Sequence, residues 1–148
     1  MKQKAQELGM NDTTFKNCHG IDEDDHLTSA YDIAIMSREL LMNHPSITKY
    51  TTIWMDSLRD GKSSLVNTNK LVRNYYGCTG LKTGSTSIAL YNLSASATRN
   101  NLSLIAVVLK APTPASFSKI ASTEDAVPFF ISTDFITSPF WPNDVPLK

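Results

Sequence analysis

The chain has 148 residues, of which 41% are hydrophobic, and its 14 basic residues balance 14 acidic residues. A length and composition of this kind suit one globular unit, and the lack of a basic excess argues against a nucleic-acid partner. No apolar run approaches the roughly 20 residues of a transmembrane helix, and the amino terminus has no charged start followed by an apolar core. From the sequence we therefore predict no export signal and no transmembrane helix.

Two helices are predicted in the first third of the chain. Residues 1–8 are typical of the end of a helix, which stops at Gly9 because glycine readily adopts the left-handed conformation there. Thr28 or Ser29 can cap a second helix, and Pro45 ends it. The apolar residues of this second helix recur at helical spacing and are expected to face the core; they are Ile33, Met36, Leu40 and Leu41.

Strands are predicted later in the chain. Residues 90–97 and 102–109 are strand-like, and residues 98–101 join them as a hairpin turn. This hairpin is expected to pack beside a strand that carries Lys82-Thr83-Gly84. The order of helices and strands predicts an α+β fold in which helices flank an antiparallel sheet.

The tripeptide Lys82-Thr83-Gly84 is the most informative motif. A lysine ammonium and a threonine hydroxyl on one strand edge offer a positive charge and a hydrogen-bond donor, which suit the terminal carboxylate of a peptide. Gly84 has no Cβ, so a substrate backbone can approach the strand closely and pair with its edge.

The motif lies in a context that resembles the serine D-alanyl-D-alanine carboxypeptidases, the low-molecular-mass penicillin-binding proteins. The matching segments follow one another in the family's order from Met1 to Pro114. They include Lys4-Ala5 with Glu7-Leu8-Gly9-Met10, His19-Gly20-Ile21-Asp22, His26 with Thr28-Ser29-Ala30, Asn67-Thr68-Asn69-Lys70-Leu71-Val72, Gly80-Leu81-Lys82-Thr83-Gly84, Tyr91-Asn92-Leu93-Ser94 and Leu104-Ile105-Ala106.

The resemblance implies a fold and a set of site residues. Residues 1–115 would be the latter, incomplete part of a penicillin-binding-protein or β-lactamase-like catalytic domain, with exposed core surface as a consequence. Residues 116–148 would be a divergent tail. Lys82 and Thr83 would bind substrate, the backbone N–H of Ser85 after Gly84 would join the oxyanion hole, and the loop residues Gly20 and Ile21 would flank the cleft.

The resemblance also implies an activity. Family members cleave the terminal D-Ala from peptidoglycan pentapeptides ending in D-Ala-D-Ala, they react with β-lactams, and they act outside the cytoplasmic membrane. The reaction passes through an acyl-enzyme on a serine and needs neither a cofactor nor a metal. Preorganised oxyanion donors matter because removing one costs roughly 3 kcal/mol in the transition state.

The sequence departs from the family pattern in two ways. The nucleophile motif Ser-x-x-Lys and the motif Ser-x-Asn belong upstream of Met1, and the single Ser-x-x-Lys here, residues 116–119, follows Lys82-Thr83-Gly84 instead. Ser116 also stands where the family is expected to carry an arginine that helps to hold the carboxylate. The chain alone is therefore predicted to be inactive, and a shifted reading frame after residue 115 is one hypothesis for the tail.

Two other functions are compatible with the motif. The chain could be a non-catalytic fragment that binds peptidoglycan peptides or pairs with a separate chain that supplies the serine. A serine β-lactamase also carries Lys-Thr-Gly, but the carboxypeptidase-like segments along the chain argue against it.

Three weaker patterns carry no function. Gly61-Lys62-Ser63 lacks the upstream glycine of a phosphate loop, because Asp56 stands there. The histidines do not form a helical pair or a tight cluster with cysteines, so no metal site is predicted. Cys18 and Cys78 are expected to be free or structural thiols.

Overall fold

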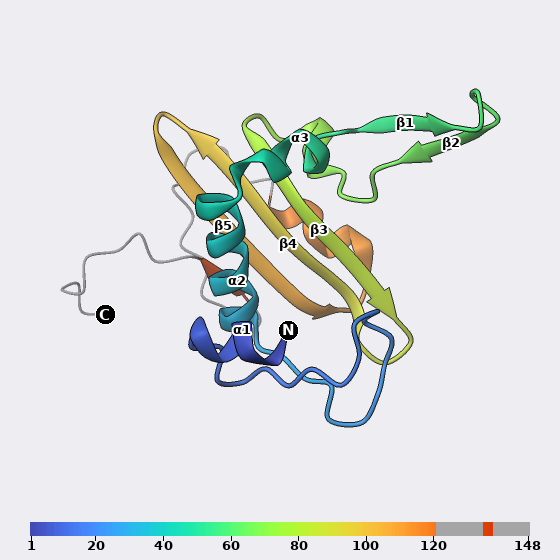
Figure 1. Cartoon of the computed structure of the whole chain (residues 1–148). Coiled ribbons are helices and arrows are strands. Elements are labelled where there is room, and N and C mark those ends of the chain that lie inside the picture. The colour runs from blue at the N-terminus through green and yellow to red at the C-terminus, as the bar shows by residue number, and fades with distance from the viewer. Residues whose placement is uncertain (121–134, 138–148) are drawn as a thin grey trace.

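A computed structural model describes residues 1–120 and 135–137. Its centre is an antiparallel sheet of four strands in the order β3-β4-β5-β6 (Figure 1). The strands are β3 (Cys78–Thr86), β4 (Leu90–Arg99), β5 (Leu102–Ala111) and β6 (Phe135–Thr137). Consecutive strands are neighbours, which leaves β3 at one edge.

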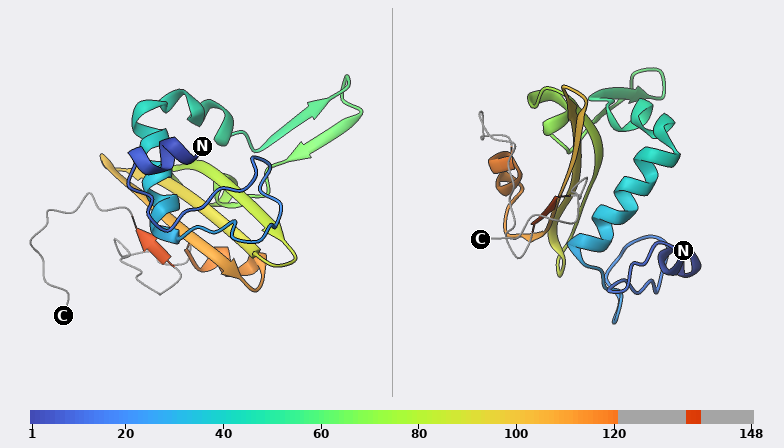
Figure 2. Two further views of the ribbon diagram at one scale, coloured as in Figure 1. Left: turned by 60° about the horizontal axis from the view of Figure 1, so that its bottom comes forward. Right: turned by 90° about the vertical axis from the view of Figure 1, so that its left-hand side faces the viewer.

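Helix α2 (Ala30–Asn43) covers one face of this sheet (Figure 2). The Ser29 side chain caps it by accepting a hydrogen bond from the Asp32 N–H, which satisfies one free donor of the first turn. The helix packs on β5 through a buried cluster that comprises Ala30, Ala34, Ile105 and Val107. Ala30, Ala34 and Ser37 are small, so the helix can approach the sheet closely. At this contact the Ser37 hydroxyl forms a hydrogen bond of 2.8 Å with the Ser94 hydroxyl of β4.

The opposite face of the sheet carries two short helical segments, α4 (Leu71–Asn74) and the 3₁₀ helix η2 (Pro114–Ile120) (Figure 2). Alternation along a strand directs Leu93 and Ala95 to this face, while Ser94 and Ser96 point toward α2. Leu93, Ala95 and Leu71 form the second buried cluster, against which Tyr75, Cys78 and Phe117 pack.

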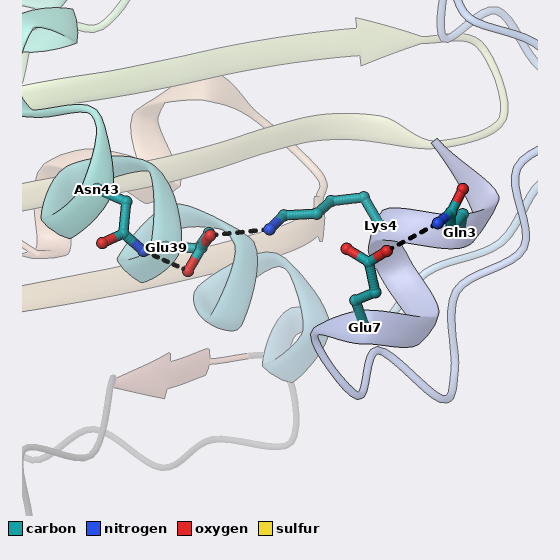
Figure 3. Close-up of polar contacts among 5 residues, drawn as sticks. All are labelled: Gln3, Lys4, Glu7, Glu39 and Asn43. Atoms are coloured by element: carbon teal, nitrogen blue, oxygen red, sulfur yellow. Dashed lines mark hydrogen bonds and ion pairs between the residues drawn. The ribbon is translucent and has the colours of Figure 1, made fainter.

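The amino-terminal helix α1 (Lys2–Glu7) lies beside α2. An ion pair of 3.0 Å joins Lys4 Nζ to Glu39 Oε1, and Asn43 donates a second hydrogen bond to Glu39 (Figure 3). The hydrogen bond from Lys4 lowers the pKa of the Glu39 carboxyl below its usual value. The contact thus links the two helices through partly exposed charges.

A connection between α2 and α4 leaves the body of the molecule. It consists of η1 (Pro45–Ile47), α3 (Thr48–Thr51) and a hairpin of β1 (Met55–Leu58) and β2 (Ser63–Val66). Figure 1 shows that the hairpin projects beyond the sheet. Gly61-Lys62 belongs to its turn, which explains the Gly-Lys-Ser pattern without a nucleotide site.

Most of the predicted elements are confirmed. α1 ends before Gly9, whose φ is +73°, and α2 runs from the predicted cap to the residue before His44 and Pro45. The predicted hairpin is present beside β3, although its turn is shorter than residues 98–101. Thr98 and Arg99 pair with β5, so Asn100 and Asn101 alone turn the chain, and both adopt positive φ.

One prediction needs correction. The apolar stripe on α2 is not fully core: Met36 is 39% exposed, and the residues buried on this helix are Ala30, Asp32, Ala34 and Ser37. The buried Asp32 carboxylate accepts hydrogen bonds from the Thr13 hydroxyl and the Asp12 N–H, which compensate for its lost contact with water. The predicted divergent tail, residues 116–148, stays a prediction: β6 within it pairs with β5, and residues 121–134 and 138–148 lie outside the described residues.

Among the residues that the structure describes, no helix has the length and apolar character needed to cross a bilayer.

Candidate functional site

The Lys-Thr-Gly motif lies on the sheet edge formed by β3. Within the described part of the chain, β3 pairs with β4 alone, so its other edge offers free backbone groups. The register places Lys82 opposite Ser94, Thr83 opposite Leu93 and Ser85 opposite Tyr91. Because residues opposite each other share a face, Lys82 lies on the α2 face and Thr83 on the α4 face. The two side chains thus flank the free edge.

Lys82 is exposed, and its ammonium donates a hydrogen bond to the Thr83 carbonyl. This contact folds the side chain back along β3, and Lys82 forms no salt bridge with another described residue. The ammonium group therefore stays beside the strand edge.

Gly84 and Ser85 continue the exposed edge. A Cβ built on Gly84 would meet nothing within 4 Å, so the space above it is open. The Gly84 carbonyl accepts a hydrogen bond of 3.4 Å from Asn92 Nδ2, which lies on β4. Ser85 follows Gly84 on the strand and is exposed.

An open cleft of about 920 Å³ adjoins this edge. The loop of residues 20–28 forms one wall, α2 contributes Ile33, Met36, Ser37 and Leu40, and β3 contributes residues 81–84. Acidic residues of the loop and Lys82 and Lys110 give the cleft its charges. All of the site residues predicted from the sequence except Ser85 line this cleft, including Gly20 and Ile21.

The loop that carries Gly20 and Ile21 is tied down at two points. Asn17 accepts a hydrogen bond from the Gly20 N–H at 2.9 Å and donates one to the Ile21 carbonyl at 3.0 Å. Asp22 Oδ1 accepts a hydrogen bond of 2.7 Å from the Thr86 hydroxyl at the end of β3. The loop and the motif strand are therefore linked directly, although 64 residues separate Asp22 from Thr86.

Thr68 contributes a second threonine hydroxyl that was not expected from the sequence. Its Oγ1 lies 2.5 Å from Thr83 Oγ1. Asn67 and Asn69 hold this segment on either side, because Asn67 donates to the Ile53 carbonyl and the buried Asn69 donates to the Gly80 carbonyl. No local pattern identifies this pair, because Asn67 and Asn69 reach partners that lie 14 and 11 residues away in the sequence.

Ser116 lies away from the motif. It belongs to η2 on the face of the sheet opposite α2, and its N–H and hydroxyl bond Thr113. Phe117 next to it packs under the sheet against Leu71, Leu93 and Ala95. That a serine in place of the family's arginine weakens carboxylate binding stays a prediction.

The cysteines and histidines have local roles. Both cysteines are free, as predicted. Burial raises the pKa of the Cys78 thiol, which faces the Gly80 carbonyl at 3.5 Å, so the thiol stays protonated. His26 accepts hydrogen bonds from backbone N–H groups of the loop. In residues 1–120, no group of three or more His, Cys, Asp or Glu side chains could hold a metal ion.

The sequence profile of one family, the D-alanyl-D-alanine carboxypeptidases of peptidase family S11, matches residues 1–113. The chain belongs to this family. It is 51% identical over 117 residues to D-alanyl-D-alanine carboxypeptidase DacF of Bacillus subtilis, a match that covers 77% of this chain and 30% of that protein.

Solved structures show the same fold. The cefotaxime-bound penicillin-binding protein D2 of Listeria monocytogenes superposes with a TM-score of 0.72 at 31% identity and covers 80% of this chain. Penicillin-binding protein 5 of Haemophilus influenzae superposes with a TM-score of 0.71 at 34% identity and covers 77%. The aligned part is 49% of the first of these chains and 33% of the second, so the chain spans half of these relatives or less.

Proposed function

We propose that this chain supplies the carboxylate-binding side of a serine D-Ala-D-Ala carboxypeptidase site. The observation that carries the proposal is the free edge of β3, where Lys82, Thr83, Gly84 and Ser85 adjoin an open cleft across from Gly20 and Ile21. The substrate would be a cell-wall peptide that ends in D-Ala-D-Ala, and the complete protein would act outside the cytoplasmic membrane.

Each residue of the edge has a chemical role in this proposal. The Lys82 ammonium and the Thr83 hydroxyl bind the terminal carboxylate from the two sides of the strand. Gly84 admits the peptide backbone, and the N–H of Ser85 donates to the carbonyl oxygen as negative charge develops on it. Gly20 and Ile21 close the cleft over the peptide.

Hydrolysis also needs an activated serine, which attacks the carbonyl carbon and releases D-Ala, and a water molecule that then cleaves the ester. Ser116 is not among the residues that line the cleft, and η2, which carries it, lies on the other face of the sheet. We therefore expect the isolated chain to bind but not to turn over. Intact-mass analysis after incubation with benzylpenicillin should show no adduct, and a stable adduct would overturn this part of the proposal.

A chimera tests the complete activity. Residues 1–113 would replace the corresponding segment of Bacillus subtilis DacF, with which they share the family match. We expect the chimera to form a penicilloyl adduct and to release D-Ala. Lys82→Met in the chimera should slow acylation by about tenfold to a hundredfold, because a charge-assisted hydrogen bond contributes roughly 1.5–3 kcal/mol. Unchanged acylation by the Lys82→Met chimera would remove Lys82 from the carboxylate site.

The alternative is a non-catalytic fragment that binds peptidoglycan peptides. The Lys82 ammonium and the open space above Gly84 favour binding in either case. The chimera distinguishes a carboxypeptidase site from a non-catalytic binding fragment. A chimera that binds the peptide but forms no penicilloyl adduct favours the binding fragment.

A further inference from the structure

Thr83 has a hydroxyl partner from outside the motif. Thr68 Oγ1 lies 2.5 Å from Thr83 Oγ1, and either atom can be the donor. Thr68 is exposed and Thr83 is half-buried, so the pair lies at the surface of the β3 edge where a ligand can reach it. No other side-chain hydrogen bond to the Thr83 hydroxyl is present in the described part of the chain.

The backbone of Thr68 is fixed on both sides. Asn67 donates from its backbone N–H to the Trp54 carbonyl at 2.8 Å and from Nδ2 to the Ile53 carbonyl at 2.9 Å. Asn69 is 2% exposed, donates to the Gly80 carbonyl at 3.1 Å and accepts from the Leu71 N–H at 3.2 Å. Asn69 thus fastens the segment to β3 only two residues before Lys82, which holds the Thr68 hydroxyl against Thr83.

Hydrogen counting shows what the pair offers a ligand. Each hydroxyl donates one hydrogen and accepts two, so one hydrogen is used between the two threonines and one remains free. A carboxylate beside Thr83 accepts the Thr83 hydrogen, and this selects the arrangement in which Thr68 donates to Thr83. Such a chain also polarises the outer hydroxyl and strengthens its bond to the anion.

We propose that Thr68 is a positioning residue that orients the Thr83 hydroxyl toward the terminal carboxylate of a peptide substrate. This inference rests on the proposed function, since it specifies how the carboxylate is recognised. Thr68 acts through Thr83 and takes no part in the covalent steps.

The first test uses the free chain and needs no ligand. The three-bond couplings of Thr83 report its χ1 rotamer by NMR. We expect one rotamer in the wild type and in Thr68→Ser, which keeps the hydroxyl, and rotamer averaging in Thr68→Val, which has the same shape without it. Thr86, which bonds Asp22 instead, should keep its couplings in all three proteins. An unchanged Thr83 rotamer in Thr68→Val would overturn the proposal.

The second test measures carboxylate recognition. The full chain would be titrated with N-acetyl-Lys-D-Ala-D-Ala and with its carboxy-terminal amide. We expect the wild type and Thr68→Ser to prefer the acid, and Thr68→Val to bind the acid about fivefold more weakly while its affinity for the amide is unchanged. A Thr68→Val variant that keeps the full acid preference would overturn the role of Thr68 and leave the proposed function intact. A wild type without any acid preference would overturn both.

Discussion

The β3 edge and the β1–β2 hairpin are both strands at the margin of the molecule, but different forces hold them. The hairpin depends on pairing between its own two strands, and its paired residues are exposed except for the half-buried Ser63. β3 is paired with β4, and beneath that pair lies a cluster that includes Leu71 and Leu93. A site that must hold groups within hydrogen-bond reach needs a strand that rests on a buried apolar cluster, as β3 and β4 do.

The polar contacts of the two regions differ in the same way. The Asp56 carboxylate in β1 accepts from the neighbouring Ser57 N–H, so the contact is local. Around β3, Asn69 reaches the Gly80 carbonyl and Asp22 reaches Thr86, and both contacts cross between segments distant in sequence. Long-range hydrogen bonds of this kind position the motif relative to the loop and to Thr68.

The largest expected difference comes from removing an apolar side chain in each region. Leu93→Ala would leave a cavity beneath β4, because Leu93 is 1% exposed, and should lower the free energy of unfolding by about 2–5 kcal/mol. The matched change Leu65→Ala in the hairpin, where the side chain is 48% exposed, should cost about 0.5 kcal/mol or less. Urea unfolding followed by circular dichroism measures both, and equal losses would show that the hairpin is packed like the core.

A smaller difference is expected for a polar anchor. Asn69→Ala leaves the Gly80 carbonyl and the Leu71 N–H without their partner and should cost about 1–3 kcal/mol. It should also speed hydrogen exchange of amides near Gly80, whereas Ser64→Ala in the exposed strand β2 should change neither quantity. Unchanged exchange in Asn69→Ala would mean that Asn69 does not hold the Thr68 segment on β3.

The smallest effect is expected at the exposed contact between α1 and α2. The pKa of Glu39 is lowered in the folded chain, mainly by the hydrogen bond from Lys4, so its contribution to stability is present above the ordinary pKa of a glutamate. The contribution is lost as the pH falls through the lowered pKa. The wild type should therefore have a slightly higher thermal unfolding temperature than Glu39→Gln at pH 7, and the two temperatures should converge in acid.

Lys4→Gln is the matched control for this contact. Lys4→Gln should lower the unfolding temperature at pH 7 as much as Glu39→Gln does. The double variant should be no less stable than either single variant, because each change breaks the same ion pair. Fully additive losses would show that Lys4 and Glu39 act independently.

Local sequence signals predicted the elements that depend on local chemistry. Ser29 and Asp32 begin α2 through a cap, Gly9 ends α1 with positive φ, and β4 and β5 follow their apolar patterns. The short strands β1 and β2 were not predicted, because their exposed residues show no alternation of apolar and polar side chains. The burial of α2 was overestimated, since helical spacing identifies an apolar stripe but does not say what covers it.

The sequence alone determined the family and the residues that carry the motif, because Lys82-Thr83-Gly84 and its flanking segments are contiguous along the chain. Tertiary structure decided which distant groups meet that motif. Three features depend on how strands and loops pack: the pairing of Thr68 with Thr83, the hydrogen bond between Asp22 and Thr86, and the position of η2, which carries Ser116, on the far face of the sheet. Such contacts follow from sheet register and from buried anchors such as Asn69, which no local pattern specifies.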